Sequence, residues 1–300
     1  MKKLLIFSIT LGVLISSCSK EQEVNPVKEE ETAASKISPS IQTASLSGNW
    51  EKRYYKGELI AYEKKNNMNL FLGDIIIAND QLSDKPQKMY DKIMGTGVVE
   101  SSSLWPNRTV NYVIDPNTPE IKRQWIITAM RNWESLTRIR FLNVSKFTDR
   151  GDHVYIAYGT IGNNSYVGRI GGAQGLNLQD DGVGVVVHEL GHTLGMYHEQ
   201  SRSDRDKYIK INWDNIREEW QPQYFNYACA DNFIVKAPKT KFDFNSIMLY
   251  ASINTTAIDL SYPVMTKHNG EIWGDNVYYG TDAPSFTDAK WVTSRYQHVK

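Results

Sequence analysis

The sequence has little of several features that would place it in common protein classes. Its 300 residues include only two cysteines, and its 34 basic and 34 acidic side chains cancel to a formal net charge of zero. Balanced charge gives no electrostatic reason to expect nucleic-acid binding, and we predict none. No apolar run after the N-terminus approaches the ~20 residues of a membrane-spanning helix, so we expect no such helix in the mature form. Hydrophobic residues make up 41% of the chain, which indicates a folded protein with a substantial core.

The N-terminus lacks an A-x-A cleavage pattern but has other marks of an export signal. Two lysines precede an apolar stretch, residues 4–15, that is too short for a permanent anchor helix. The segment Ile15, Ser16, Ser17, Cys18 is similar to the lipobox of bacterial lipoproteins, in which the cysteine becomes the lipidated first residue. The alternative is an ordinary signal peptide that is cleaved near Cys18.

We therefore predict a protein that is exported from a bacterial cell. Lipidation at Cys18 would make outer-membrane lipid a partner, and Ser19 rather than aspartate after the cysteine favours an outer-membrane lipoprotein. Without lipidation the protein would be secreted.

Composition divides the chain further. Residues 19–41 are charged and poor in large apolar side chains, which is typical of a flexible tether. Apolar residues then return, with strand-like runs at residues 59–62 and 70–78, and the small-residue segment 94–103 is the predicted boundary. The predicted parts are a lipoprotein-type signal peptide (1–18), a tether (19–41), a small N-terminal domain (42–95) and a larger domain (96–300).

The larger domain has the pattern of an α+β fold. Residues 109–115 alternate like a half-buried strand, and further strands are expected at residues 153–159 and 175–179. Between them a long helix is predicted, with Asn117 or Thr118 as its cap and Pro119 in its first turn. Strands that alternate with helices in this way indicate an α+β domain. The expected apolar face of the helix comprises Ile121, Trp125, Ala129, Trp133 and Leu136.

The stretch VVVHELGHTLGMYHEQ holds three of the six histidines in the chain. His188 and His192 are four residues apart, so on a helix both imidazoles project from one face. Zinc binds histidine nitrogens at ~2.0–2.1 Å, and two ligands one turn apart can reach one ion. Gly195 allows the helix to stop, so the chain can turn back and present His198 as a third ligand. Three protein ligands leave a position for water, as in a catalytic zinc site.

Glu189 follows the first histidine and is the predicted general base. It can take a proton from the water that attacks a peptide carbonyl and later pass it to the leaving amine. A surface helix that carries histidines by chance would account poorly for the extended H-E-x-x-H-x-x-G-x-x-H pattern. We therefore expect one zinc ion per catalytic domain, and protein or peptide substrates.

The longer stretch HELGHTLGMYHEQSRSDRD resembles the zinc signature of the astacin family of metzincin metalloproteases. In that family a glutamate, here Glu199, follows the third histidine, and an Arg/Asp-rich stretch comes next. The segment FNSIMLY resembles the family's methionine turn, with Met248 and, two residues later, Tyr250. Residues 165–178 resemble its central stretch and substrate-pairing edge strand. The resemblance covers about residues 96–300 and implies a zincin-type catalytic domain with a mixed sheet, an active-site helix and a Met-turn.

The resemblance also implies roles for individual residues. Tyr250 would be a fifth zinc ligand in the resting enzyme and would swing away to stabilise the oxyanion. Met248 would pack beneath the histidines, and Glu199 would bind the new N-terminal ammonium of the mature enzyme. The chain departs from the family in two respects, since its two cysteines cannot form the two usual disulfides and Leu249 replaces a common histidine.

The stretch NLFLGDIII, residues 69–77, has two readings. Gly-Asp is ordinary turn chemistry, so it can join two short strands. Many astacins, however, carry F-x-G-D in a propeptide whose aspartate occupies the zinc site, and residues 71–74 fit that pattern. A carboxylate is a good zinc ligand and displaces the reacting water. The resemblance therefore implies a zymogen in which Asp74 is the latent-state zinc ligand and which an activating protease opens.

The predicted function is zinc-dependent hydrolysis of peptide bonds in proteins by a metalloendopeptidase. A different metzincin subfamily is one alternative, and Tyr250 and Glu199 argue against it. The other alternative is a lipoprotein that only binds protein or peptide, with zinc as a structural element. Such a protein has no use for Glu189 as a base, whereas a hydrolase does.

Overall fold

The computed structural model describes residues 41–42, 46, 48–86, 103–227, 241–274 and 282–299. The predicted signal peptide, almost all of the tether, Cys18 and the boundary after residue 95 lie outside these residues, as does Cys229. The described residues all fall in one unit, residues 38–300. No helix among them is long and apolar enough to cross a membrane.

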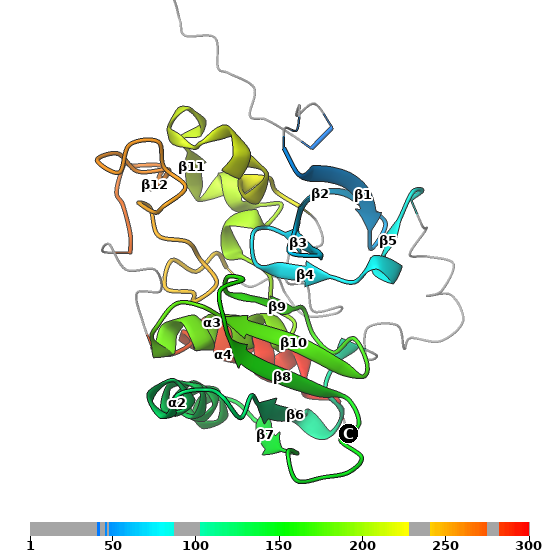
Figure 1. Ribbon diagram of the computed structural model, residues 1–300. Coiled ribbons are helices and arrows are strands. Elements are labelled where there is room, and N and C mark those ends of the chain that lie inside the picture. The colour runs from blue at the N-terminus through cyan, green and yellow to red at the C-terminus, as the bar shows by residue number, and fades with distance from the viewer. Residues whose placement is uncertain are drawn as a thin grey trace, which may run out of the picture. The chain divides into compact units, whose positions relative to one another are not determined.

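The first five strands form an antiparallel sheet in the order β5-β1-β2-β3-β4 (Figure 1). Two-residue turns with positive φ at both positions join the first three strands, at Lys56–Gly57 and at Asn66–Asn67. Such turns match the twist of a hairpin, and asparagine and glycine adopt them at low cost. A 3₁₀ turn, η1 (Asn79–Gln81), precedes β5. The strands are β1 (Trp50–Tyr55), β2 (Glu58–Lys65), β3 (Met68–Phe71), β4 (Ile75–Ile77) and β5 (Leu82–Ser83).

The sheet continues through five more strands, in the order β9-β10-β8-β6-β7. All their pairings are parallel except that between β9 and β10. A parallel pairing of β4 with β9, in which Ile75 lies opposite Ser165, joins the two halves into one ten-stranded mixed sheet. The strands predicted at residues 109–115, 153–159 and 175–179 are confirmed. The five strands are β6 (Thr109–Ile114), β7 (Arg140–Asn143), β8 (His153–Tyr158), β9 (Asn164–Tyr166) and β10 (Ala173–Leu178).

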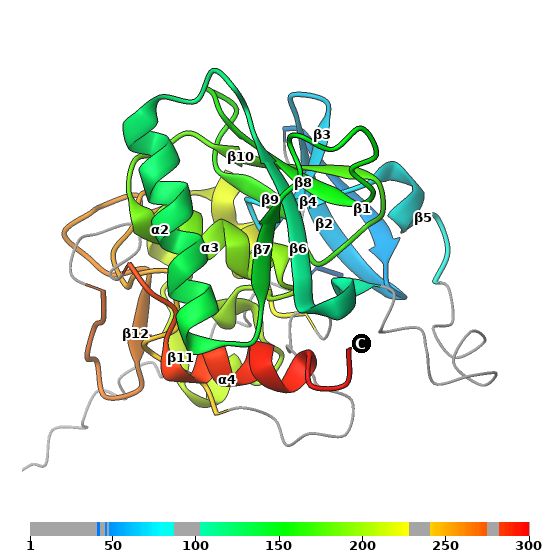
Figure 2. The ribbon, with the colours of Figure 1, turned by 90° about the horizontal axis from the view of Figure 1, so that it is seen from below.

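Three helices pack with the second half of the sheet around the main core (Figure 2). They are α2 (Glu120–Leu136), α3 (Val183–Thr193) and α4 (Phe286–Arg295). Helix α2 begins after Pro119, without the side-chain cap predicted at Asn117 or Thr118. Its predicted apolar face is also partly wrong, because Ile121 and Leu136 are 59% and 49% exposed. The contacts of α2 with α3 and the sheet rotate the buried face toward Ile126, Ala129, Met130 and Trp133.

Two buried tryptophans fix the position of helix α3. The indole N–H of Trp133 in α2 donates to the carbonyl of Val187, at 3.0 Å. The indole N–H of Trp105, which precedes β6, donates to the carbonyl of Thr193, also at 3.0 Å. Both rings are at most 1% exposed. A buried indole needs such a partner, and here each partner lies on the helix that carries the HExxH motif.

Helix α3 ends at the predicted glycine. Gly195 has φ +105°, its N–H donates to the carbonyl of His192, and the N–H of Met196 donates to that of Gly191. This paired arrangement is a Schellman motif, which reverses the chain direction after a helix. The chain therefore returns toward the helix within a few residues and can bring His198 back to it.

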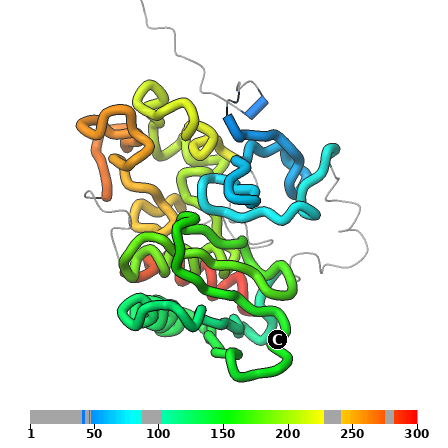
Figure 3. The backbone as a smooth tube through the Cα atoms, in the orientation of Figure 1, coloured from blue at the N-terminus to red at the C-terminus, as the bar shows by residue number. Residues whose placement is uncertain are grey.

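The remaining described segments form a second layer of short elements beside the sheet. Their core contains Ile209, Tyr224 and Met265 and lies away from the main core. Tyr197, Phe225 and Tyr227 from these segments pack with the N-terminal strands instead. Figure 3 shows the course of the backbone through these segments. The short elements are η3 (Pro106–Arg108), η4 (Glu199–Ser201), η5 (Arg205–Lys207), β11 (Ile209–Ile211), η6 (Trp213–Asn215), η7 (Glu218–Tyr224) and β12 (Met265–Lys267), with β11 and β12 paired.

Gly191 in α3 provides a test of this packing. A Cβ atom at this position would lie 2.6 Å from the sulfur of Met248, far inside normal contact distance. We expect Gly191→Ala to lower the free energy of unfolding by about 1–3 kcal/mol, the usual cost of overpacking. Alanine is the better helix former by ~1 kcal/mol, so a loss of stability isolates the clash. Urea denaturation measures the effect.

The matched control is Gly159→Ala, since a Cβ there would meet nothing within 4 Å. We expect this control to stay within about 0.5 kcal/mol of the unchanged protein. Equal effects of the two substitutions would contradict the packing argument.

Candidate metal centre

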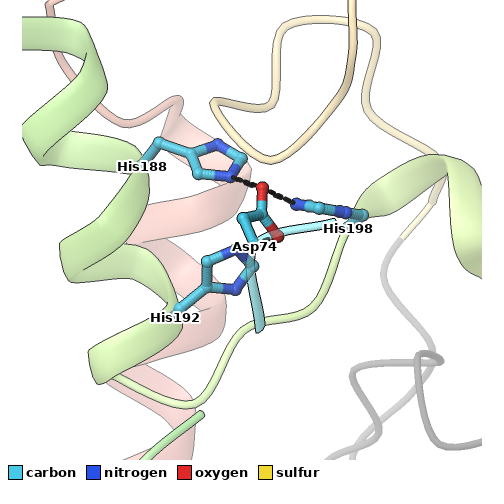
Figure 4. A group of neighbouring side chains, drawn as sticks. All are labelled: Asp74, His188, His192 and His198. Carbon is cyan, nitrogen blue, oxygen red and sulfur yellow. Dashed lines mark hydrogen bonds and ion pairs between the residues drawn. The ribbon is translucent and has the colours of Figure 1, made fainter. Parts of the chain in front are cut away.

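Four buried side chains converge on one point between α3, the segment after it and the turn between β3 and β4 (Figure 4). One oxygen of Asp74 lies 3.5 Å from Nε2 of His188 and 3.1 Å from Nε2 of His198. Its other oxygen lies 3.4 Å from Nε2 of His192. The four ligand atoms are within 4.8 Å of one another. The structure thus brings together residues that are up to 124 positions apart in the sequence.

Backbone carbonyls orient the two helical histidines. Nδ1 of His188 lies 2.8 Å from the carbonyl oxygen of Ile247, and Nδ1 of His192 lies 2.8 Å from that of Met196. A carbonyl only accepts, so each Nδ1 carries the proton and donates it. Nε2 of each ring then presents its lone pair to the centre, which is how proteins prepare histidine for a metal.

His198 reaches the centre from the chain that follows the Schellman motif. The next residue, Glu199, donates its backbone N–H to the carbonyl of Met248 at 2.9 Å, which ties this segment to the methionine turn. The ring of His198 packs against that of Tyr250, with centroids 4.7 Å apart. Tertiary contacts, rather than the helix, therefore place the third imidazole.

The pKa values of these groups suit metal binding. Burial lowers the pKa of His188, and it lowers that of His198 to about 4, so both rings are neutral near pH 7. Burial pushes the pKa of Asp74 up, but the surrounding imidazoles outweigh it and hold the pKa well below its usual range. Neutral imidazoles at His188 and His198 and an ionised carboxylate at Asp74 are the forms that bind a metal.

The residues present fit a zinc ion. Neither Nε2 of His192 nor one oxygen of Asp74 has a hydrogen-bond partner among the described residues, although both are buried. The Nε2 atoms of His188 and His198, which both face the centre, are only 3.2 Å apart. Ring nitrogens and a carboxylate that face one another at such distances suit a cation between them. Three imidazole nitrogens with a carboxylate oxygen make a donor set that zinc accepts.

Glu189, next to His188 in α3, is not one of the four residues whose ligand atoms converge. It is fully buried, and neither of its carboxyl oxygens has a hydrogen-bond partner among the described residues. Burial, and then the charge of Asp74, raise its pKa well above the usual value. A buried carboxyl group without partners is costly, and such groups concentrate where proton transfer is needed.

The methionine turn is held by a residue that the sequence analysis missed. Asp288 in α4 accepts hydrogen bonds from the hydroxyl of Ser246, at 2.7 Å, and from the N–H of Ile247, at 2.9 Å. It is 3% exposed and also accepts from the N–H of Ser285, with which it forms a capping box. Because the carbonyl of Ile247 orients His188, Asp288 acts on the metal centre through the turn. The pattern SFTD, a capping box at the start of a helix, was the available signal.

Tyr250 lies beside the centre, with its hydroxyl turned to the N-terminal strands. The hydroxyl donates to the carbonyl of Leu72, at 3.1 Å, and lies 3.3 Å from the amide oxygen of Gln223. Gln223 is 2% exposed and is a second residue that the sequence analysis missed. In this arrangement the tyrosine therefore binds a peptide carbonyl.

The turn that carries Asp74 requires a glycine. Leu72 and Gly73 have φ values of +54° and +97°, in the left-handed region. A Cβ at Gly73 would lie 2.5 Å from the amide nitrogen of Gln223. Glycine alone combines this backbone conformation with so close an approach.

Glu199 is buried and pairs with residues of its own domain. It accepts from Arg202 at 2.8 Å and from the N–H of Asp243 at 2.9 Å. Burial raises its pKa to about 7, although Arg202 acts in the opposite direction. In this structure Glu199 thus has a cation partner other than an N-terminal ammonium.

Comparison with known proteins matches this geometry to a family. The profile of the peptidase family described as Astacin matches residues 97–297. Among solved structures, high choriolytic enzyme 1, a hatching enzyme zinc-protease from the medaka fish Oryzias latipes, is similar with a TM-score of 0.55 and 30% identity. That similarity covers 66% of this chain and 96% of the fish chain.

Curated relatives are longer proteins. Bone morphogenetic protein 1 of Xenopus laevis is 39% identical over 152 residues, which cover 49% of this chain and 20% of that protein. Zinc metalloproteinase nas-14 of Caenorhabditis elegans is 31% identical over 192 residues, which cover 63% of this chain and 36% of that protein. The matched region thus spans a minor part of each of these relatives.

Asp288 provides a test of how the centre is supported. We expect Asp288→Ala to lower the free energy of unfolding by about 3 kcal/mol, because it leaves the buried donors of Ser246 and Ile247, and the partly buried N–H of Ser285, without an acceptor. It should also weaken zinc retention, since His188 loses its fixed partner, with a loss of about 10-fold in affinity. Urea denaturation and competition with a zinc-binding dye measure the two effects.

The control is Asp181→Ala, which removes a carboxylate whose side chain is 63% exposed and which pairs with Lys122. This change should leave zinc affinity unaltered and stability within about 1 kcal/mol. If Asp288→Ala retained zinc as well as this control, the link from Asp288 to His188 would be refuted.

Proposed function

The chain belongs to the astacin family of peptidases, and on that premise we propose that it is a zinc endopeptidase made as a latent precursor. The catalytic domain comprises about residues 96–300. Residues 42–95 form an inhibitory prosegment, whose N-terminal strands close the metal centre. The single observation that carries the proposal is the convergence of Asp74 with His188, His192 and His198.

The expected fold and cofactor are confirmed at the level of the family. The mixed sheet, the helices and the similarity to the fish hatching enzyme agree with a zincin-type domain. The family consists of zinc metalloproteinases, and the described residues contain a cluster able to hold a metal. The roles of individual residues below are our proposal.

His188, His192 and His198 would hold the zinc ion. When bound, zinc supplies Lewis acidity that activates water and polarises a peptide carbonyl. The backbone carbonyls of Ile247 and Met196 keep the two helical imidazoles in the tautomer that the metal needs. The centre then has one further position for water and substrate. In this structure the carboxylate of Asp74 occupies that position.

Glu189 would be the general base. Its carboxylate is adjacent to the ligand set, and neither oxygen is committed to another described group. A water that takes the place of the Asp74 carboxylate would lie beside it and could give up a proton as it attacks the substrate carbonyl. A raised pKa favours retention of that proton until the amine leaves.

Tyr250 would stabilise the oxyanion. Its hydroxyl already donates to a peptide carbonyl, that of Leu72, at the edge of the metal centre. After the prosegment leaves, the same donor is available to the carbonyl oxygen of the scissile bond, on which negative charge develops. The Leu72 carbonyl thus occupies the donor that a substrate would use.

Asp74 would keep the precursor silent by occupying the site that water needs. The N–H of Ser165 in β9 donates to the carbonyl of Asp74, at 2.9 Å, and β4 pairs with β9 immediately after it. Phe71 packs edge-on against Tyr227 with centroids 4.9 Å apart, which anchors the other side of the turn. A carboxylate held in place by its own chain binds without the entropy cost of a free ligand.

An activating protease would cut between the prosegment and the catalytic domain. The described part of the catalytic domain begins at Ser103, whose carbonyl accepts from the N–H of Arg169 at 2.8 Å. After cleavage the new N-terminal ammonium is proposed to pair with Glu199 in place of the contacts with Arg202 and Asp243.

We further propose that the protein is exported from a bacterial cell and lipidated at Cys18. Both proposals rest on the sequence of the N-terminus. An outer-membrane lipid would then hold the precursor by its prosegment. Without lipidation the same protein would be secreted. Proteins or peptides are the proposed substrates in either case.

The latch and the base are tested together by hydrolysis of casein and a quenched peptide. The precursor without its signal is prepared unchanged and as Asp74→Ala and Glu189→Gln, each before and after limited trypsin. We expect uncut Asp74→Ala to be active while the uncut unchanged precursor is silent. Glu189→Gln should reduce kcat by about 10²–10⁴-fold even after trimming, because the proton acceptor is lost.

The control for the latch is Asp80→Ala, an exposed carboxylate of the same prosegment that lies in η1. It should remain silent before trypsin. Trimmed, zinc-loaded and folded protein that hydrolyses nothing would refute the protease and favour a binding module.

Tyr250→Phe tests the oxyanion role separately. Removal of the hydroxyl should lower kcat of the trimmed enzyme by about 10²-fold with little change in KM, because the donor acts mainly in the transition state. Tyr262→Phe, which removes the hydroxyl of a side chain that is 62% exposed, is the control. An unchanged kcat in Tyr250→Phe would exclude this role.

A further inference from the structure

A pocket of about 480 Å³ opens beside the metal centre on the side of Asp74 and Tyr250. One wall comes from the chain just before β9 and just after β10, with Asn163 and Asp180. The other wall comes from η7 and from the segment after the methionine turn, with Trp220 and Leu260. A pocket of this size takes a long side chain, and its contact with Asp74 and Tyr250 places it next to the bond to be cleaved.

The prosegment passes this pocket without filling it. Gly73, which has no side chain, lines the pocket immediately before Asp74. Ile75 pairs with Ser165 and Ile76 with Tyr166 in parallel, and Gly73 and Asn163, which precede these two strands, both line the pocket. A substrate backbone that lies along β9 would present a side chain where the prosegment has glycine.

Asp180 is the one charged side chain that the described catalytic domain contributes to the lining. One of its carboxylate oxygens accepts from the side-chain amide of Asn163 at 2.8 Å, and its N–H donates to the side-chain oxygen of that residue at 3.0 Å. These two bonds hold the carboxylate on the wall. No lysine or arginine among the described residues forms an ion pair with it.

The rest of the lining is neutral. The described catalytic residues supply amides, hydroxyl groups and a few apolar surfaces, from Gln179, Gln223, Asn254, Thr255, Thr256 and Ile253 among others. The single cation among the described lining residues is Lys65 of the β2–β3 hairpin, which belongs to the prosegment and would leave with it. The pocket of the active enzyme would therefore have a net negative charge.

From this charge and geometry we infer that Asp180 determines specificity: the pocket selects a substrate with a lysine or arginine side chain near the scissile bond and rejects an acidic one. The inference rests on the proposed endopeptidase function and names its substrate class. A carboxylate that is held in place and lacks a cation partner attracts a basic side chain and repels a carboxylate.

The test uses the trimmed enzyme, freed of trypsin, and a set of quenched peptides. Each peptide has lysine, glutamine or glutamate at one of the three positions on either side of the cleaved bond. The peptides are otherwise identical. At one position we expect kcat/KM to be highest for the lysine peptide, lower for the glutamine peptide and lowest for the glutamate peptide. The lysine and glutamate peptides should differ by about fivefold or more. The difference should shrink at high salt, as screening requires.

Asp180→Asn and Asp181→Asn form a matched pair of neighbouring variants. Asp180→Asn should lose the difference in kcat/KM between the lysine and glutamate peptides. Asp181 does not line the pocket and pairs with Lys122, so Asp181→Asn should retain the difference.

The outcomes separate the two proposals. Hydrolysis of no peptide would overturn the proposed function itself. Hydrolysis with equal rates for lysine and glutamate versions, or a preference that survives in Asp180→Asn, would overturn only the role of Asp180. The measurement on the unchanged enzyme keeps the inference testable even if Asp180→Asn does not fold.

Discussion

The contact of one carboxylate with three imidazoles is the constraint on which the rest of this structure depends. Asp74 can lie among the histidines only if the Nε2 atoms face inward, and the carbonyls of Ile247 and Met196 ensure that they do. Asp288, from the last helix, in turn accepts from the N–H of Ile247 and so holds the turn that carries this carbonyl. Hydrogen bonds of specific geometry thus support the centre from residues as far apart in the sequence as 74 and 288.

The turn between β3 and β4 serves two purposes at once. Leu72 and Gly73 reverse the chain in the left-handed region, as a Gly-Asp turn would, and the same reversal projects Asp74 into the centre. The two readings of NLFLGDIII are therefore compatible. Three separate observations explain why this position has no side chain. Gly73 has a left-handed backbone conformation, it lies against Gln223, and it lines a pocket that the prosegment leaves unfilled.

The features that could be predicted are those that depend on residues close together in the sequence. The spacing of His188 and His192, the stop at Gly195 and the strand at residues 109–115 follow from helical and strand periodicity and from the conformational freedom of glycine. The SFTD capping box could have placed Asp288 at the start of a helix. Its bonds to the methionine turn, and the contacts of Gln223, could not be found in this way, since those partners are dozens of positions away. The buried face of α2 was misjudged at Ile121 and Leu136 because docking to α3, rather than periodicity alone, decides which side is covered.

The parallel pairing of β4 with β9 has a consequence for solubility. While the sheet has ten strands, β9 is an interior strand with both edges bonded. Departure of residues 48–86 would turn it into an edge strand with free N–H and C=O groups, the kind of surface on which foreign strands add and aggregates begin. β9 spans only Asn164–Tyr166, so it could hold a short extended peptide but offers too few positions for lasting attachment of another sheet. The open edge of an activated molecule would therefore be only three residues long.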